Sequence, residues 1–137
     1  MAYLLEGLYV FHSGIEMLAG SFLFLRGRGS NDPASEVRPV AKLYRRWHGA
    51  GLLGLSFLGW LVIWKGQLRS EVGRTVSQAL ALFHFGAVAA HVMAAVESNN
   101  QNLDPTDEGY VSTAAAAKSP HVLLTIGFLA HAAGSMD

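Results

Sequence analysis

Residues 49–63 form an apolar run in which Ser56 is the only polar side chain. A helix on the surface of a soluble protein carries a polar face that recurs every 3.6 residues. This run has no such face, so a soluble four-helix bundle, the main alternative, would need a partner to cover it. The run therefore indicates a helix that crosses a membrane.

Composition and length extend this interpretation to the whole chain. Of the 137 residues, 51% are hydrophobic and only 15% are charged, whereas about a quarter of a soluble protein is charged. A helix that rises ~1.5 Å per residue needs roughly 20 residues to cross a bilayer. We therefore predict an all-α fold, a small polytopic membrane protein with a single membrane domain over residues 1–137. It is a bundle of four transmembrane helices, at about residues 2–25, 44–64, 75–97 and 113–134.

The fourth of these segments is the least regular. Its apolar part, residues 121–133, is too short to span a bilayer alone. Ser119 and Pro120 give a helix-start signal, with serine as the N-cap and proline in the first turn. We expect the segment to span fully only if residues 114–117 join it, which gives one helix with a kink at Pro120.

Small residues predict where the helices pack, because they let two backbones approach closely. Two parallel rows with a spacing of seven follow the first segment: Gly7, Gly14 and Ser21, and beside them Ser13 and Gly20. On the second segment, Ala50 and Gly54 form a pair of small residues four positions apart. The sequence Arg26-Gly27-Arg28-Gly29 predicts a basic, helix-breaking end to the first helix, since glycine often ends helices.

Basic residues predict the orientation. Four spans put both termini on one side, and the opposite side then carries seven of the ten basic residues: Arg26, Arg28, Arg38, Lys42, Arg45, Arg46 and Lys118. The positive-inside rule places the loop between the first two helices toward the cytoplasm, matrix or stroma, and both termini on the opposite side. The sequence does not indicate the organelle.

Ionisable side chains inside apolar segments are costly and mark functional or structural contacts. His12 and Glu16 lie four residues apart on one helix face, and His84 and His91 lie seven apart on one stripe. We expect these four residues to form an intramembrane polar contact between the first and third helices.

The six histidines also sort by depth into two layers. One layer lies toward the side of the termini and the other toward the basic side: His12, His84 and His131, and His48, His91 and His121. Two imidazoles from different helices at matched depth are suitable axial ligands for haem b, and one imidazole for chlorophyll. His12 with His84 and His48 with His91 are therefore the candidate cofactor ligands. A bundle without a cofactor is the equal alternative.

Other chemistry has no motif in this chain. Cysteine is absent, which excludes disulfides and thiolate metal sites. Neither Glu-x-x-His nor His-Glu-x-x-His occurs, so we predict no metal site. A P-loop and a Gly-x-Ser-x-Gly motif are also missing, so an enzyme is not indicated. A net charge of zero gives no reason to expect nucleic acid.

These observations favour a non-catalytic integral membrane subunit or scaffold. It would contact lipid and other membrane protein subunits, packed within a larger complex of an energy-transducing membrane. Its small-residue rows offer more close-packing surface than four short helices need among themselves. A haem- or chlorophyll-binding four-helix bundle, an electron or pigment carrier, is the alternative. A proton-coupled transporter that uses Glu16 is the third hypothesis.

Overall fold

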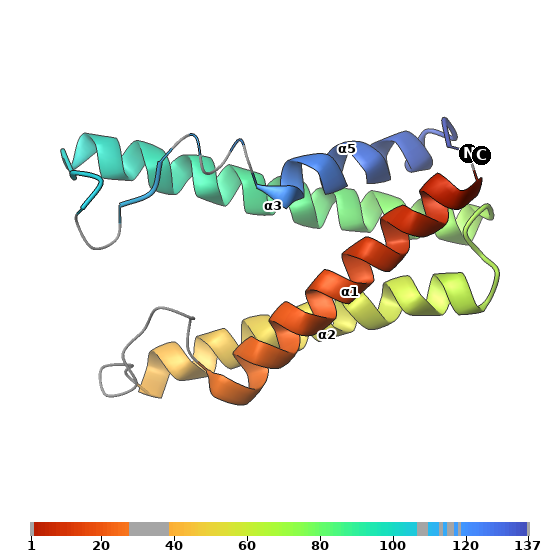
Figure 1. Cartoon of the computed structure of the whole chain (residues 1–137), viewed down its shortest axis with the longest axis horizontal. Helices are drawn as coiled ribbons and strands as arrows, with labels where there is room; N and C mark the ends of the chain where they lie inside the picture. The colour runs from red at the N-terminus through yellow and green to blue at the C-terminus, as the bar shows by residue number, and fades with distance from the viewer. Residues whose placement is uncertain are drawn as a thin grey trace. The chain divides into compact units, whose positions relative to one another are not determined.

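The fold is all-α, as the sequence predicted. The computed structural model describes residues 2–27, 39–106, 110–112, 114, 117 and 119–136. Its principal helices are α1 (Ala2–Arg26), α2 (Pro39–Trp64), α3 (Glu71–Asn100) and α5 (Pro120–Ala132), shown in Figure 1. Residues 28–38, between the first two helices, lie outside the described residues. The chain divides into two compact units, residues 1–72 and 73–137, and each is described by itself. A single membrane domain over residues 1–137 stays a prediction.

Three helices are long and apolar enough to cross a membrane, and the fourth is shorter. The three predicted long segments match α1, α2 and α3, although α2 and α3 extend further than expected. At ~1.5 Å per residue these helices are about 37 to 45 Å long, which exceeds the ~30 Å hydrocarbon core. The 13 residues of α5 cover only about 20 Å by the same measure.

The observed start of α5 bears on the predicted helix over residues 113–134. Ser119 has extended backbone angles, φ −61° and ψ 136°, and its side chain accepts a hydrogen bond from the His121 N–H. Pro120 follows at the start of α5. Ser119 thus caps a new helix, because proline lacks the N–H that would continue an earlier one. The helix-start signal matches the start of α5, and the full span over residues 113–134 stays a prediction, because residues 113, 115, 116 and 118 lie outside the described part of the chain.

In the first unit, α1 and α2 form an antiparallel pair with a close glycine contact. A Cβ atom added at Gly49 would lie 2.6 Å from the Phe24 amide nitrogen and 2.7 Å from the Gly20 carbonyl oxygen. Further along, the Ser56 hydroxyl donates to the Ser13 carbonyl oxygen at 2.7 Å. The row of Ser13 and Gly20 is therefore the packing row of α1.

The other predicted small-residue positions do not make this contact. Gly7 and Gly14 have no neighbouring atom within 4 Å of an added Cβ, and the same is true of Gly54. Ala50 and Gly54 lie on the exposed face of α2. The spacing showed that small residues form rows, but it did not distinguish the row that meets the partner helix.

The end of α1 matches the predicted stop. Gly27 has φ +62°, and its N–H donates to the Leu23 carbonyl at 2.8 Å. This left-handed conformation suits glycine, which has no side chain to oppose it. A Cβ atom there would lie 3.2 Å from Arg46 Nε, so the end of α1 packs against the start of α2.

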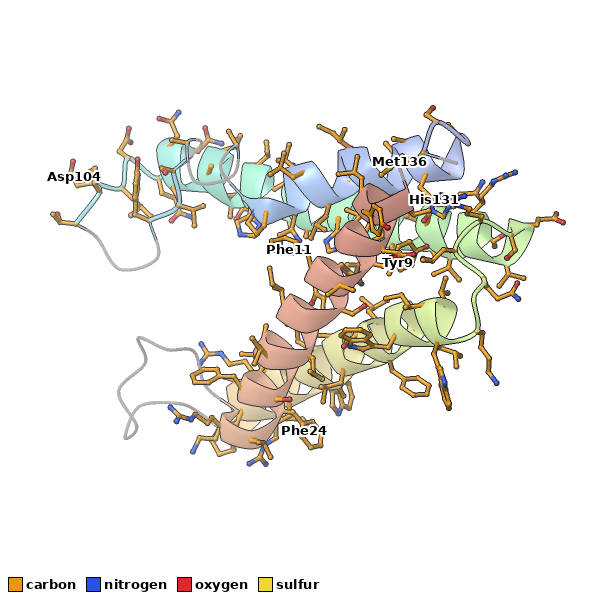
Figure 2. All side chains as sticks on the ribbon, turned by 45° about the vertical axis from the view of Figure 1, so that its right-hand side comes forward. Tyr9, Phe11, Phe24, Asp104, His131 and Met136 are labelled. Carbon is orange, nitrogen blue, oxygen red and sulfur yellow. The ribbon has the colours of Figure 1, made fainter. Side chains whose placement is uncertain are left out.

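Large apolar side chains cover the outside of the α1–α2 pair. Trp47 and Phe57 on α2 are about two-thirds exposed, at 65% and 66%. Phe11 and Phe24 extend from α1 in Figure 2 and are exposed as well. Such a surface is costly in water and favourable in lipid or against a membrane protein partner.

In the second unit, α5 lies along α3 in the opposite direction (Figure 1). The Ser77 hydroxyl and His131 Nδ1 are 2.6 Å apart, which places the end of α5 beside the start of α3. His131 is labelled in Figure 2. The side chains of Leu124 and Phe128 are also buried. The buried face of α5 thus recurs at three- and four-residue intervals, as helix packing requires.

The chain turns back after α3. Asn102 has φ +53°, and the Leu103 N–H donates to the Ser98 carbonyl at 3.0 Å. The Val111 N–H donates to the Ser98 hydroxyl at 3.1 Å, so the returning chain lies beside the end of α3. Asp104 lies in this turn region, as Figure 2 shows.

Candidate functional site

His12 and Glu16 are buried on one face of α1, at 0% and 3% exposure. The four-residue spacing predicted this shared face. His12 lies at the level of Gly59, because a Cβ added there would be 3.5 Å from His12 Cδ2. Glycine at this point of α2 therefore leaves room for the imidazole.

His48 occupies a different level of the same unit. It is exposed on α2 and directly precedes Gly49, which packs against Phe24. His12 lies beside Gly59. Gly59 follows His48 by eleven positions on α2, which corresponds to about 16 Å along the helix axis. His12 and His48 are thus well separated along the helices of this unit, and their assignment to two membrane layers stays a prediction.

His84 contacts His121, a histidine that the sequence placed in the other layer. Its Nδ1 atom is 2.8 Å from His121 Nδ1, and the ring centroids are 5.0 Å apart. His84 is fully buried and stacks on Phe128, with an interplanar angle of 4°. Since only one nitrogen of such a pair carries the shared proton, one imidazole donates to the other.

His91 lies on the same stripe of α3, as predicted. Its ring centroid is 6.2 Å from that of His121. Its Nδ1 atom lies 2.8 Å from the Ala87 carbonyl oxygen. A carbonyl only accepts, so the proton of neutral His91 is on Nδ1 and the lone pair is on Nε2.

The second unit corrects the two-layer assignment. His84 and His121 were expected in different layers, yet they form a hydrogen-bonded pair. The reason is the late start of α5. Because helix α5 begins only at Pro120, His121 lies in its first turn, beside the middle of α3.

Sequence reasoning missed that His121, Ser77 and His131 form contacts between helices. The available signal was a heptad spacing on α3, where Ser77, His84 and His91 follow one another at intervals of seven. Ser77 and His131 are both at 0% exposure, so a buried hydrogen bond joins α3 to α5.

The predicted contact of His12 and Glu16 with His84 and His91 joins residues of different units. It stays a prediction. The same holds for the cofactor pairs His12 with His84 and His48 with His91. Within one unit, the His84–His121 pair does not suit haem, because iron between two imidazoles keeps the ligand nitrogens about 4 Å apart.

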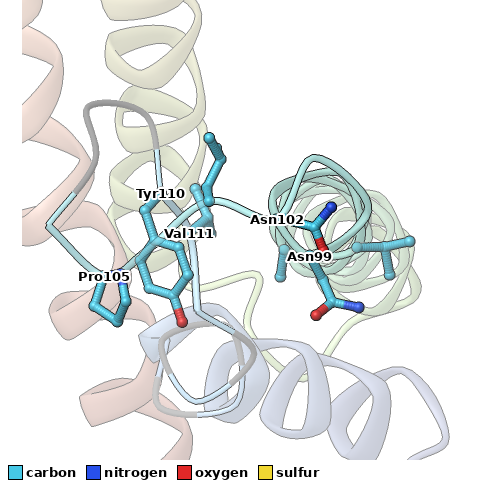
Figure 3. Close-up of a pocket in the computed structure, with 8 residues that line it drawn as sticks. Asn99, Asn102, Pro105, Tyr110 and Val111 are labelled. Carbon is cyan, nitrogen blue, oxygen red and sulfur yellow. The ribbon is translucent and has the colours of Figure 1, made fainter.

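Two cavities among the described residues lie at helix ends. A pocket of about 440 Å³ lies where the chain turns back at the end of α3, lined by Asn99, Asn102, Pro105, Tyr110 and Val111 among others (Figure 3). Among the described residues, no carboxylate or imidazole lines it. A second pocket, of about 360 Å³, lies between the start of α1 and the end of α2, with Glu6 and Arg69 at its edge.

Comparison with known proteins gives no relative to draw on. No protein-family model, no curated protein and no solved structure matches this chain.

Proposed function

We propose that this chain is a non-catalytic integral membrane subunit or scaffold that packs against other membrane proteins. The observation that carries the proposal is the outer strip of α2, defined as Trp47, Gly51, Gly54 and Phe57. These residues are exposed, and the two glycines have open space around an added Cβ. Glycines between aromatic side chains form a shallow groove into which a helix of another subunit fits.

Lipid alone does not explain this strip as well. Lipid chains are satisfied by any apolar surface, whereas small residues are enriched where helices meet. The α1–α2 contact already uses Gly20 and Gly49, so Gly51 and Gly54 are additional. The partner is therefore expected to be an apolar helix with side chains large enough to fill the groove.

The test is a native mass measurement after purification in a mild detergent. We expect the wild-type chain to co-purify with larger membrane partners. The Gly51→Leu and Gly54→Leu variants fill the groove, and they should release the partner while the chain stays folded. Gly7→Leu is the matched control, because Gly7 is exposed with equal space but lies outside the strip. A stable wild-type monomer would refute the proposal.

We also propose the orientation that the basic residues predict, with residues 28–38 toward the cytoplasm, matrix or stroma. Two contacts support it. Leu5 and Ile63 line one pocket, so the start of α1 is beside the end of α2. The Ser77–His131 bond brings the end of α5 beside the start of α3. Each contact, within its own unit, supports placing that unit's terminus on the side of residues 65–70.

Single-cysteine labelling tests this orientation, because the native chain has no cysteine and gives no background. In sealed vesicles, an impermeant maleimide should label the Ser35→Cys and Thr106→Cys variants from one side. It should label Ser135→Cys only from the other. Labelling of Ser35→Cys and Ser135→Cys from the same side contradicts the orientation.

Two further hypotheses keep their own tests. The haem or chlorophyll alternative requires a Soret or chlorophyll band in protein purified from its native membrane. Proton-coupled transport requires that Glu16→Gln abolishes flux in reconstituted vesicles. Unchanged flux removes Glu16 from such a mechanism.

A further inference from the structure

The pocket between the start of α1 and the end of α2 combines two opposite charges with an apolar wall. Its volume is about 360 Å³, and its lining residues are Leu5, Glu6, Ile63, Gly66, Leu68 and Arg69. All of them belong to one compact unit, so the pocket is defined within it. Ligand pockets begin at about 300 Å³, so this one has room for one small group.

The charged and the apolar side chains of this pocket differ in exposure. Glu6 and Arg69 are exposed, and they bring a carboxylate and a guanidinium to the same pocket. Leu5 is buried at 1% exposure, and Ile63 and Leu68 are half-buried. A ligand that fits both parts carries a positive group, a negative group and an apolar portion.

The turn after α2 holds the Arg69 side of the pocket in place. Gly66 has φ +64°, and the Gln67 N–H donates to the Val62 carbonyl at 2.9 Å, which closes the end of the helix. The Ser70 hydroxyl donates to the Gln67 carbonyl at 2.8 Å. Arg69 therefore extends from a hydrogen-bonded turn, which limits the ordering that binding requires.

The residues around this end of the helix pair are those of a membrane–water interface. Tyr3 and Trp64 are 88% and 80% exposed. Lys65 Nζ lies 5.2 Å from the centroid of the Trp64 ring. Tyrosine and tryptophan are enriched at the level of the lipid headgroups, and lysine directs its charge there. We therefore expect the pocket to face the headgroups.

The two charges select among the common headgroups. Arg69 suits a phosphate, and Glu6 suits a primary ammonium, which has N–H donors for a carboxylate. A choline headgroup lacks such donors and is recognised by aromatic rings, and among the described residues no aromatic side chain lines this pocket. A headgroup with only negative charge would lie beside Glu6 and be repelled.

We propose that Glu6 and Arg69 bind the headgroup of an ethanolamine phospholipid. The carboxylate receives the ammonium, and the guanidinium receives the phosphate. The acyl chains begin against the apolar wall of Leu5, Ile63 and Leu68. This site is independent of the scaffold function, and its test requires no partner protein.

The experiment is native mass spectrometry of the delipidated full chain in detergent, titrated with ethanolamine, choline and anionic glycerol phospholipids that carry identical acyl chains. We expect one ethanolamine lipid to bind at least about 3-fold more tightly than the others, a modest factor because both charges are exposed. Glu6→Gln should shift the preference to the anionic lipid, because Arg69 then meets the phosphate alone. Arg69→Gln should weaken the binding of all three lipids.

Two variants are matched controls. Lys65→Gln removes a positive charge from the same end of α2, and Lys65 is outside the pocket lining. Glu97→Gln removes an exposed carboxylate from the other unit. Both should bind the ethanolamine lipid as tightly as the wild type does, and circular dichroism checks that every variant is folded.

Free phosphoethanolamine distinguishes a lipid from a soluble ligand with the same charges. It lacks acyl chains for the apolar wall, so it should not displace the lipid at equal concentration. The proposal fails if this displacement occurs or if the wild type binds the three lipids equally. It also fails if neither pocket variant changes the preference, or if Lys65→Gln weakens binding as much as Arg69→Gln does.

Discussion

Replacement of Gly49 by alanine tests the close contact of α1 and α2 most directly. An added Cβ would meet only main-chain atoms of α1 in its nearest contacts, at 2.6 Å from Phe24 N and 2.7 Å from Gly20 O. Backbone atoms in a helix cannot rotate away as a side chain can. We therefore expect the two helices to move apart along this contact.

The size of the effect follows from these distances. Carbon makes favourable contact at about 3.5 Å, so a 2.6 Å approach requires a separation of about 0.9 Å. Overpacking of this kind typically costs about 1–3 kcal/mol. Alanine is also about 1 kcal/mol better than glycine within a helix, which offsets part of the loss.

Gly51→Ala is the control, because it gains the same helix propensity without a clash. Gly51 has no neighbouring atom within 4 Å of an added Cβ. The difference between the two variants isolates the clash, and we expect Gly49→Ala to be less stable than Gly51→Ala by about 1–3 kcal/mol.

The assay is unfolding by SDS in mixed micelles, followed by tryptophan fluorescence. All three tryptophans lie on α2, so the signal reports the release of that helix from α1. The variant Gly20→Ala should also destabilise the pair, since its Cβ would lie 2.9 Å from Gly49 O. The Gly20→Ala, Gly49→Ala double variant should lose less unfolding free energy than the two single variants added together, because one separation of the helices relieves both clashes. Equal unfolding midpoints for Gly49→Ala and Gly51→Ala would refute the reasoning.

Three further variants test single hydrogen bonds, and a fourth, Ser13→Ala, serves as a contrast. Ser56→Ala removes the bond to the Ser13 carbonyl and should lower the unfolding free energy by about 1 kcal/mol in the same SDS assay. Ser13→Ala removes a buried hydroxyl that has no partner among the described residues, so it should leave the unfolding free energy unchanged or raise it. Ser119→Ala removes the N-cap of α5 and should cost about 0.5–2 kcal/mol, seen as faster hydrogen exchange in α5. Ser77→Ala breaks the bond to His131 and should lower the free energy of local opening at the end of α5 by about 1 kcal/mol. Amide hydrogen exchange measures this as a faster rate there, and unchanged exchange rates in α1 are the control.

The sequence by itself determined the helical elements. Residues 49–63 have no polar face, and Gly27 with its positive φ follows directly after α1. Ser119 and Pro120 marked the true start of α5. These are local properties, because hydrophobic length, caps and helix-breaking residues act within one or two turns of the chain.

The pairing of side chains was decided by the tertiary structure. Gly7 and Gly14 resemble Ser13 and Gly20 in the sequence, yet only the second pair packs against α2. Both rows satisfy the helical period equally, so only the direction from which α2 approaches distinguishes them.

The histidines show the same division. Their spacing along the chain follows from counting residues along a continuous helix, and His12 and His48 lie at different levels of the α1–α2 pair. It failed for His121, because the break at Ser119 shifts α5 along α3 and brings this residue to His84. How far one helix slides along another depends on the summed packing of the whole contact, and no local pattern of residues encodes that sum.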